Sequence, residues 1–338
     1  MKKNVCVLFG GKSEEYEVSL SSSYTILENI DKNKYDIHKI GITKEGKWLR
    51  YYGDNESILK DTWQDKTDEV VMNFSTSSVD KMPHDTVFLP VLHGTFCEDG
   101  RLQGIFETLG LKYVGCDSSS SFLCMDKNLT KSVAKSLNIP CVPSICVTEN
   151  QFDFEVLAKE VLNLTYPVFV KPTKSGSSRG SNVVYSQNEL LTAINEAIEF
   201  SSSVLIEKYI KSTECEIGIL STHNGIIFSP VGSISYDKDF YDYKEKYLNN
   251  KTVYNIPATV SYEVQKEITE YARLLFSHLN LNGLSRIDFF VDENDNVYFN
   301  EINTFPGFTK GSMFPMLFEK MGYSFSEILD ILIENAKI

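Results

Sequence analysis

The chain of 338 residues lacks the features that mark several specialised classes of protein. Its seven cysteines are scattered and form no C-x-x-C pair, so the sequence predicts neither a zinc site nor a disulfide framework. A reduced, cytoplasmic compartment is therefore expected. Positive charge is also scarce: the net charge is −13, whereas sequence-independent nucleic-acid binding needs a basic face, so no nucleic-acid partner is expected.

A long hydrophobic run is missing where a leader or membrane span would begin. Lys2-Lys3 is followed by only a short apolar run before Gly10-Gly11, too short for a signal sequence or a membrane helix, so no membrane partner is expected. Hydrophobic residues make up 42% of the chain and charged residues 23%, which is ordinary for a globular protein. The length allows two or three domains with a sizeable core.

Short strands and amphipathic helices alternate in the first third of the chain. The predicted elements are strands at 4–9, 35–40 and 87–92, a short strand at 113–115, and helices at 18–30 and 102–109. The first strand leads through Gly10-Gly11 into the first helix, and this order is typical of an α/β layer. The block is predicted to end near Cys116.

The remainder of the chain mixes helices with strands, some of them antiparallel. The predicted helices cover 127–137, 154–163, 190–200, 263–279 and 325–335, and the predicted strands cover 142–147, 168–171, 181–184, 204–207, 216–220 and 226–229. A tyrosine-rich connection covers roughly 233–257. A polar connection of that length in a compact domain is usually a functional lid.

Asp288, Glu301 and Asn303 are oxygen donors on two segments that are predicted to form a β-hairpin, with a polar turn at 292–296. Side chains two residues apart on a strand point to the same side, so Glu301 and Asn303 share a face that Asp288 can meet from its neighbour. A few oxygens with room for water and phosphate are typical of Mg²⁺ on a nucleotide. A solvated edge hairpin is the alternative interpretation.

A glycine- and serine-rich segment at 171–180 joins two predicted strands. Its small residues would let backbone N–H groups approach phosphate oxygens, and Lys171 and Lys174 would neutralise them. The segment is not a Walker loop, which opens a helix and ends in Gly-Lys-Ser/Thr. An ordinary flexible hairpin loop is an equally good interpretation of the segment alone.

Glu207-Lys208-Tyr209-Ile210 follows a predicted strand at a domain junction. An extended segment there can hydrogen-bond the polar edge of a purine, while Tyr209 and Ile210 pack on its face. Glu214 is placed to accept hydrogen bonds from ribose hydroxyls. The alternative is an edge strand that simply ends in charged residues.

Three other places carry candidate substrate contacts. His93 stands at the carboxyl end of a predicted strand, where functional groups gather, although it could simply bond its own turn. The acids of 11–17 suit a helix N-terminus, or one of them could meet a substrate ammonium. Arg286 lies two residues before Asp288 on the same strand face. It suits an oxyanion or a phosphate, or it pairs with the metal-ligand carboxylates.

Taken together and in this order, these elements resemble the D-alanine–D-alanine ligases of the ATP-grasp superfamily. The resemblance covers essentially the whole chain, and the combination is highly specific although each motif is short. The matching segments are 10–19, His93-Gly94, 98–100, 102–104, 125–127, Lys171-Pro172, 176–178, Glu207-Lys208, 240–247, 286–288 and 301–304.

The resemblance implies a three-domain α/β fold of the ATP-grasp type. An N-terminal parallel α/β domain would cover 1–117, a central α+β domain 118–207, and a C-terminal α+β domain with an antiparallel sheet 208–338. ATP would bind between the second and third domains as a co-substrate, with two Mg²⁺ ions for which Mn²⁺ could substitute. D-alanine would be the substrate, and the assembly would be a homodimer.

The resemblance also implies roles for single residues. For ATP, the phosphates would be held by Lys127 and Lys171, the adenine by Glu207, Lys208, Tyr209 and Ile210, and the ribose by Glu214. The metal ions would be held by Asp288, Glu301 and Asn303. The first D-alanine would meet Glu15, which is linked to Ser177 and to Tyr247 on the lid, while Lys246 would reach the γ-phosphate. The reacting carboxyl would lie among His93, Arg286 and Gly307, and the second substrate would lie near Ser312 and Met313.

Three departures from the family pattern leave the predicted metal ligands unchanged. Cys97 stands where glycine is usual, Arg179 replaces an apolar residue, and Lys310-Gly311 precedes Ser312 where a Ser-His pair is common. D-alanine is the predicted acceptor because the apolar Met313 suits its methyl group, and D-serine is the alternative, since a pocket shaped by size alone rejects an added hydroxyl poorly. A non-catalytic nucleotide-binding protein of the same fold is the hypothesis from another class.

Overall fold

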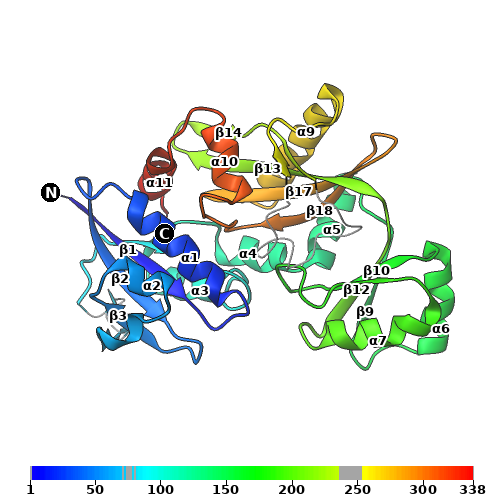
Figure 1. The fold of residues 1–338 in the computed structure, drawn as a ribbon, viewed down its shortest axis with the longest axis horizontal. Helices are drawn as coiled ribbons and strands as arrows, with labels where there is room; N and C mark the ends of the chain where they lie inside the picture. Colours follow the sequence, from blue (N-terminus) through cyan, green and yellow to red (C-terminus); the bar gives the residue numbers. More distant parts are fainter. Residues whose placement is uncertain (1, 71, 74–77, 80, 236–252, 338) are drawn as a thin grey trace.

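The computed structural model describes residues 2–70, 72–73, 78–79, 81–235 and 253–337. Lys246, Tyr247 and most of the predicted lid lie outside these residues, so the predictions made for them stay predictions. The described chain forms an elongated molecule in which one sheet lies at each end and a third lies between them (Figure 1). This mixed, multi-sheet α/β arrangement confirms the predicted fold class.

The first sheet has the strand order β4-β3-β2-β1-β7-β8. Its strands are β1 (Lys3–Gly10), β2 (Tyr35–Ile42), β3 (Trp48–Tyr51), β4 (Thr67–Glu69), β7 (Val87–Pro90) and β8 (Lys112–Tyr113), and its helices are α1 (Tyr16–Asn29), α2 (Asn55–Leu59) and α3 (Arg101–Thr108). Strands β2, β1, β7 and β8 run parallel as predicted, whereas β3 and β4 add an antiparallel edge that the sequence analysis did not include. Residues 5–9 of β1 are fully buried, as a parallel strand covered on both faces requires.

The second sheet, at the other end of the molecule, has the order β11-β10-β12-β9. It consists of β9 (Ser144–Thr148), β10 (Val168–Pro172), β11 (Asn182–Val184) and β12 (Ser203–Lys208), with helices α6 (Phe154–Val161) and α7 (Gln187–Ile198) packed against it. Each of its strand pairs is antiparallel. Strand β9 begins two residues later than predicted, after Pro143, because proline has no N–H for a ladder.

The third sheet lies in the middle of the molecule and is antiparallel in every pair. Its strands are β13 (Ser212–Thr222), β14 (Gly225–Phe228), β15 (Gly232–Ser235), β16 (Val253–Asn255), β17 (Leu284–Asp292) and β18 (Val297–Asn303), and the helices around it are α4 (Ser118–Met125), α5 (Lys127–Ser136), α9 (Tyr262–His278), α10 (Met313–Glu319) and α11 (Phe325–Glu334). The predicted hairpin of β17 and β18 is confirmed. Helices α4 and α10 were missed, and α4 begins where Ser120 N donates a 2.7 Å hydrogen bond to its N-cap, Asp117.

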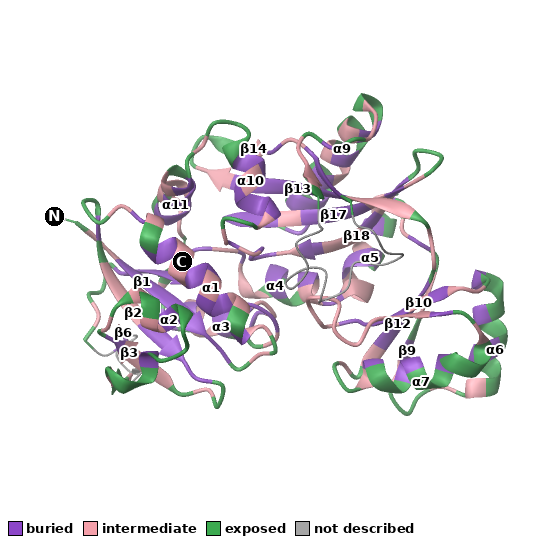
Figure 2. Cartoon of the chain, viewed as in Figure 1, coloured by how far each residue is buried: buried purple, intermediate pink, exposed green. Residues whose placement is uncertain are grey.

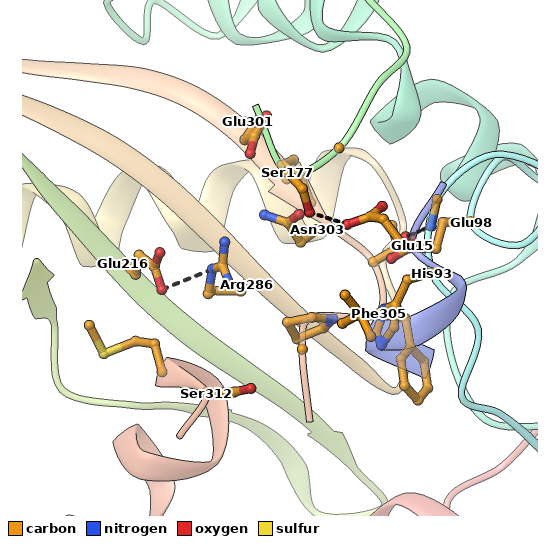
Figure 3. A pocket seen from close by; sticks show the side chains of 18 of the residues that line it. Glu15, His93, Glu98, Ser177, Glu216, Arg286, Glu301, Asn303, Phe305 and Ser312 are labelled. Atoms are coloured by element: carbon orange, nitrogen blue, oxygen red, sulfur yellow. Dashed lines mark hydrogen bonds and ion pairs between the residues drawn. The ribbon is translucent and has the colours of Figure 1, made fainter. Parts of the chain in front are cut away.

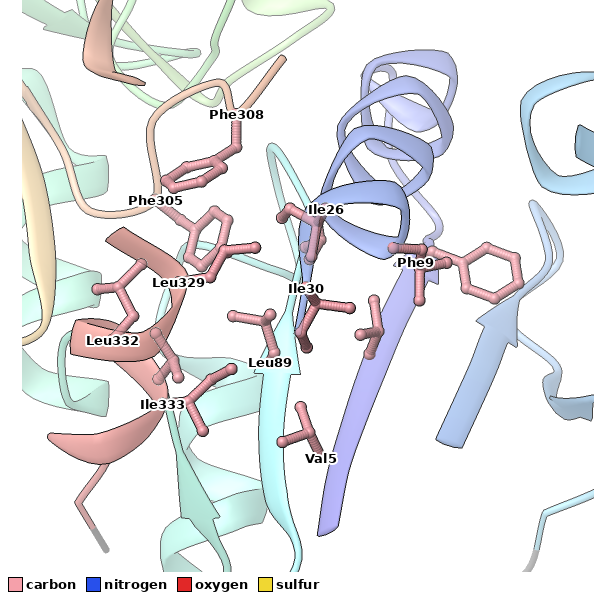
Figure 4. Packing of buried hydrophobic residues seen from close by; sticks show 14 of the residues in the cluster. Val5, Phe9, Ile26, Ile30, Leu89, Phe305, Phe308, Leu329, Leu332 and Ile333 are labelled. Carbon is pink, nitrogen blue, oxygen red and sulfur yellow. The ribbon is translucent and has the colours of Figure 1, made fainter. Parts of the chain in front are cut away.

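One hydrophobic core joins the first sheet to the C-terminal helix α11. Val5 and Leu89 from the sheet lie in the same buried cluster as Leu329 and Ile333 from α11 (Figure 4). Colouring by burial shows the buried positions on the inner faces of the sheets and helices (Figure 2). By contrast, α4 and α5 pack on β18 of the third sheet although they precede the second sheet in sequence.

Candidate active site

Two adjoining cavities open beside the third sheet, with volumes of about 320 and 350 Å³. The first lies toward the N-terminal sheet and the second toward the second sheet, because residues from those parts of the chain line them. The residues that line both cavities are Lys127, Ser175, Ser177, Glu216, Ile234 and Glu301. A ligand in one cavity would therefore meet a ligand in the other at this shared wall.

Three carboxylates stand in a row across the third sheet, and the outer two, Glu216 and Glu301, belong to the shared wall. In the backbone register of the third sheet, Glu216 of β13 is opposite Asp288 of β17, and Asp288 is opposite Glu301 of β18. Residues in one such row project from the same face of a sheet. Two cationic side chains contact this row: Arg286 lies beside Glu216 and Asp288, and Lys127 lies beside Glu301.

Arg286 lies between two of these carboxylates. Its Nε donates to Asp288 Oδ1 at 2.8 Å, and its Nη2 donates to Asp288 Oδ2 at 2.7 Å. The same Nε lies 3.0 Å from Glu216 Oε2 (Figure 3). Burial alone would lower the pKa of Arg286, but the Asp288 and Glu216 carboxylates raise it above its usual value. The guanidinium stays charged, and its contacts with Asp288 match the alternative interpretation, in which Arg286 pairs with the carboxylates predicted to bind metal. Its predicted role at an oxyanion stays a prediction.

The predicted metal ligands are partly in contact with one another. Asn303 Nδ2 donates to Asp288 Oδ2 at 3.0 Å, and Glu301 Oε2 lies 3.1 Å from Lys127 Nζ. Within the described ranges, no three histidine, cysteine, aspartate or glutamate side chains are close enough to form a metal site. The donors that line the cavities are nonetheless hard oxygens, which suits Mg²⁺ rather than a soft metal. Their assignment as ligands stays a prediction.

A buried ionic cluster forms the floor of the second cavity. Glu207 Oε1 lies 2.8 Å from Lys131 Nζ and Glu207 Oε2 lies 2.7 Å from Lys171 Nζ, while Lys171 Nζ also donates a hydrogen bond to Asn300 Oδ1 at 3.1 Å. Burial opposes the charge of Glu207, but the two ammonium groups lower its pKa to about 2. The Glu207 side chain thus contacts lysines. Lys208, Tyr209, Ile210 and Glu214, the other predicted nucleotide contacts, line the same cavity.

The glycine- and serine-rich segment contacts the N-terminal part of the chain. Ser177 Oγ donates a hydrogen bond to the Glu15 carboxylate, as the sequence analysis predicted (Figure 3). A Cβ at Gly176 would lie 2.5 Å from Glu15 Oε2, so glycine allows this close approach. Arg179, one of the three departures, lies 2.9 Å from Glu14 Oε2. The segment therefore bridges the two cavities instead of projecting into solvent as a free hairpin.

His93 lies behind this contact at the end of the first sheet. Its ring is buried, its Nε2 is 3.3 Å from Ser22 Oγ, and burial lowers its pKa, so the neutral imidazole is favoured. Glu98 accepts a 2.6 Å hydrogen bond from Gly94 N. Burial first, and then the nearby Glu15 carboxylate, raise the pKa of Glu98 well above its usual value. Cys97 is buried beside Gly11, where a Cβ would lie 3.1 Å from its sulfur.

The two residues predicted for the second substrate, Ser312 and Met313, lie at the start of α10. Both line the first cavity, as does Gly307, which was predicted to lie at the reacting carboxyl. Ser312 Oγ accepts a 3.0 Å hydrogen bond from Thr309 N, and its hydroxyl lies 2.8 Å from Thr309 Oγ1. Met313 is buried, whereas Lys310 of the third departure is exposed. This wall offers the hydroxyls of Thr309 and Ser312 and the apolar side chain of Met313 to a ligand.

Comparison with known proteins supplies the family. Residues 4–116 match the family model of the D-ala D-ala ligase N-terminus, and residues 133–334 match that of the D-ala D-ala ligase C-terminus. The chain belongs to the D-alanine–D-alanine ligase family. The resemblance stated from the motifs is therefore confirmed over nearly the whole chain.

Named relatives and solved structures that match nearly the whole chain support this family assignment. The chain is 42% identical to D-alanine–D-alanine ligase B of Clostridium tetani, over 99% of this chain and 94% of that protein. It is 40% identical to the D-alanine–D-alanine ligase of a Thermoanaerobacter strain, over 99% and 96%. Among solved structures, the VanG D-Ala:D-Ser ligase of Enterococcus faecalis has a TM-score of 0.89 and 39% identity, with 99% of both chains covered. The D-alanine–D-alanine ligase of Coxiella burnetii has a TM-score of 0.87 and 30% identity, over 99% and 93%.

Two charged groups and one amide at the site of this ligase were not predicted from the family motifs. Glu216, Lys131 and Asn300 were not among the predicted site residues, although each contacts one that was. Lys131 lies one helical turn after Lys127, and Glu216 lies two residues after Glu214, so both share a face with a predicted residue. That spacing was the available signal.

No helix in the described part of this ligase is long and apolar enough to cross a membrane.

Proposed function

We propose that this protein joins two D-alanine molecules into D-alanyl-D-alanine with consumption of ATP, for the synthesis of peptidoglycan precursors. The observation that carries the proposal is the pair of adjoining cavities that meet at Lys127, Glu216 and Glu301. One cavity contains the predicted nucleotide residues, and the other contains the predicted substrate residues. Relatives of nearly the same length that are named D-alanine–D-alanine ligases support it.

The first step needs two negatively charged reactants to approach each other. The carboxylate of the first D-alanine attacks the γ-phosphate of ATP and forms an acyl phosphate with release of ADP. Lys127 and Lys171 would neutralise the phosphates, and Lys246 would join them from the lid. A bound Mg²⁺ supplies further charge neutralisation, and Asp288, Glu301 and Asn303 would hold it.

The second step forms the peptide bond. The amine of the second D-alanine attacks the acyl carbon, and phosphate leaves from the tetrahedral intermediate. Arg286, His93 and the backbone at Gly307 would face the developing oxyanion, while Glu15 would hold the ammonium of the first D-alanine. Water would hydrolyse the acyl phosphate, so a closed lid, with Tyr247 in contact with the Glu15–Ser177 pair, is part of the proposal.

The identity of the acceptor is the finer part of the proposal. D-alanine is proposed because Met313 presents a buried apolar side chain to the first cavity. D-serine is the second candidate, because the similar VanG structure is that of a D-Ala:D-Ser ligase and Ser312 presents a hydroxyl on the same wall. Two Mg²⁺ ions with Mn²⁺ as a substitute, a homodimer and the three-domain division are proposed from the family likeness. A cytoplasmic location is proposed from the scattered cysteines, which suggest no disulfide framework.

The test is to incubate purified protein with ATP, Mg²⁺ and D-alanine, alone or together with D-serine or D-lactate, and to identify the products by mass. D-alanyl-D-alanine as the main product is expected in every mixture. D-alanyl-D-serine as the main product would favour the second candidate. ATP hydrolysis that does not depend on D-alanine, without any dipeptide, would favour a non-catalytic nucleotide-binding protein and contradict the proposal.

A further inference from the structure

The row of carboxylates across the third sheet contains one more member than the proposed metal site uses. Glu216 stands opposite Asp288 in the register of β13 and β17, and Asp288 stands opposite Glu301 in that of β17 and β18. Like charges directly opposite on neighbouring strands destabilise a sheet. The side chain of Glu216 is only 7% exposed, so solvent does little to screen its charge. A carboxyl group that the proposed reaction does not use is therefore buried at the wall that the two cavities share.

Arg286 is within reach of two members of this row. Its Nε lies 2.8 Å from Asp288 Oδ1 and 3.0 Å from Glu216 Oε2, and the side chain of Arg286 is 16% exposed. A second guanidinium nitrogen donates to Asp288 Oδ2 at 2.7 Å. Both oxygens of Asp288 thus accept hydrogen bonds from Arg286. A divalent cation that engaged Asp288 would compete with Arg286 for the same oxygens.

We propose that Glu216 is a positioning residue that retains the Arg286 guanidinium when Asp288 is engaged by a divalent cation. This inference rests on the proposed function, because it requires the cation at Asp288. Since Nε already lies 3.0 Å from Glu216, the exchange of partner needs no displacement of either strand. Glu216 makes cation binding easier, and it keeps the Arg286 guanidinium paired and in the wall of the first cavity.

The test is a direct measurement of Mn²⁺ binding to the protein with ADP, in which free Mn²⁺ is followed by electron paramagnetic resonance. The neutral amide of Glu216→Gln can still accept a hydrogen bond from Arg286, but this bond is weaker than one to a carboxylate. The Mn²⁺ dissociation constant should therefore rise about tenfold, which corresponds to the difference between a charge-assisted and a neutral hydrogen bond. The matched control is Glu293→Gln, which removes the same charge from the exposed turn between β17 and β18 and should bind Mn²⁺ like the wild type. Equal affinities of the two variants would overturn the inference.

A second pair of variants separates action through Arg286 from direct contact with the cation. In an Arg286→Met background, Glu216→Gln should no longer weaken Mn²⁺ binding, because there is no guanidinium left to hold. An unchanged weakening in that background would show direct action on the cation and would overturn the inference. If Glu216→Gln does not fold, Glu216→Asp replaces it in the wild-type and in the Arg286→Met background. Its shorter side chain draws the carboxylate away from Arg286 while it keeps the charge.

Asp288→Asn separates this inference from the proposed function on which it rests. Loss of Mn²⁺ binding in Asp288→Asn is expected and places the cation at Asp288. If Asp288→Asn binds Mn²⁺ like the wild type, the proposed metal site is wrong and the inference falls with it. If Asp288→Asn loses Mn²⁺ while Glu216→Gln retains full affinity, only the role of Glu216 is overturned.

Discussion

At the scale of single residues, a buried glutamate between two lysines is the most deeply buried of the ionic contacts described at the site. Glu207 is 2% exposed, Lys131 1% and Lys171 5%, and both lysines reach the same carboxylate. Burying three charged groups costs free energy that their mutual attraction must offset. The second lysine makes the cluster net positive, so the floor of this cavity would attract the phosphates of a nucleotide.

The pH dependence of stability should reveal this cluster. The pKa of Glu207 falls from 4.5 to about 2 on folding, so its contribution is fully present above pH 4.5 and is lost as the pH falls toward 2. In that window the unfolded chain binds the extra proton, and acid therefore destabilises the fold. Glu207→Gln should show a shallower loss of unfolding free energy across the window than the wild type, measured by urea unfolding. An identical slope in the two proteins would argue against the depressed pKa.

Glu301 belongs to the shared wall of the two cavities, where its carboxylate lies 3.1 Å from Lys127. Glu301→Gln keeps the shape of the side chain but removes the charge that would hold a cation. Dipeptide synthesis should fall by about a hundredfold or more, because a bound cation supplies several kcal/mol of charge stabilisation. The melting temperature should change little, since the side chain faces a cavity. Activity within a few-fold of the wild type would rule out the assignment.

At the scale of elements, the contact between the glycine- and serine-rich segment and the Glu15 loop couples the two cavities. A Cβ at Gly176 would lie 2.5 Å from Glu15 Oε2, too close for the carboxylate to remain in place. Gly176→Ala should therefore raise the KM for D-alanine by about tenfold, the value of one charge-assisted hydrogen bond. Steady-state kinetics at saturating ATP measure this change.

Gly104→Ala is the matched control for that substitution. Gly104 lies in α3, where an added Cβ has its nearest neighbour, the Ser118 Cβ, at 4.0 Å. Alanine in a helix interior is more favourable than glycine by about 0.5–1 kcal/mol, so this variant should be as stable as the wild type or more stable. A KM for D-alanine that rises equally in both variants would show that the Gly176 contact has no special role.

The elements of the site could be predicted from the sequence better than the contacts between them. The hairpin of β17 and β18 was predicted because a polar turn separates two apolar runs, and the hydrogen bond between Ser177 and Glu15 was implied by the family motifs. The contact of Glu216 with Arg286 was not predicted, because the register of β13 against β17 joins segments about seventy residues apart. The alternation of side chains along a strand predicts which residues share a face, but it does not predict which residues of the neighbouring strand lie opposite them.

At the scale of the whole molecule, the ends of the chain pack together. Helix α11 contributes Leu329, Leu332 and Ile333 to the cluster that also contains Val5 and Leu89 of the first sheet (Figure 4). The apolar pattern of 325–335 predicted a helix, but it could not name the surface that the helix covers, because any apolar face satisfies the same pattern. The consequence is that the walls of the first cavity, which come from the first and third sheets, are held together by a continuous core.

The two tryptophans can test this coupling, because Trp48 and Trp63 both lie with the first sheet and report its unfolding. Leu329→Ala removes a fully buried side chain from α11, so it should destabilise the shared core by about 2–5 kcal/mol. The tryptophan fluorescence transition in urea should therefore move to lower concentration, although the substitution is far away in sequence. Leu157→Ala, in the separate core of the second sheet, should move this transition less. If Leu329→Ala left the tryptophan transition unchanged, the first sheet would fold independently of α11 and the shared core would contribute nothing to holding the cavity walls in place.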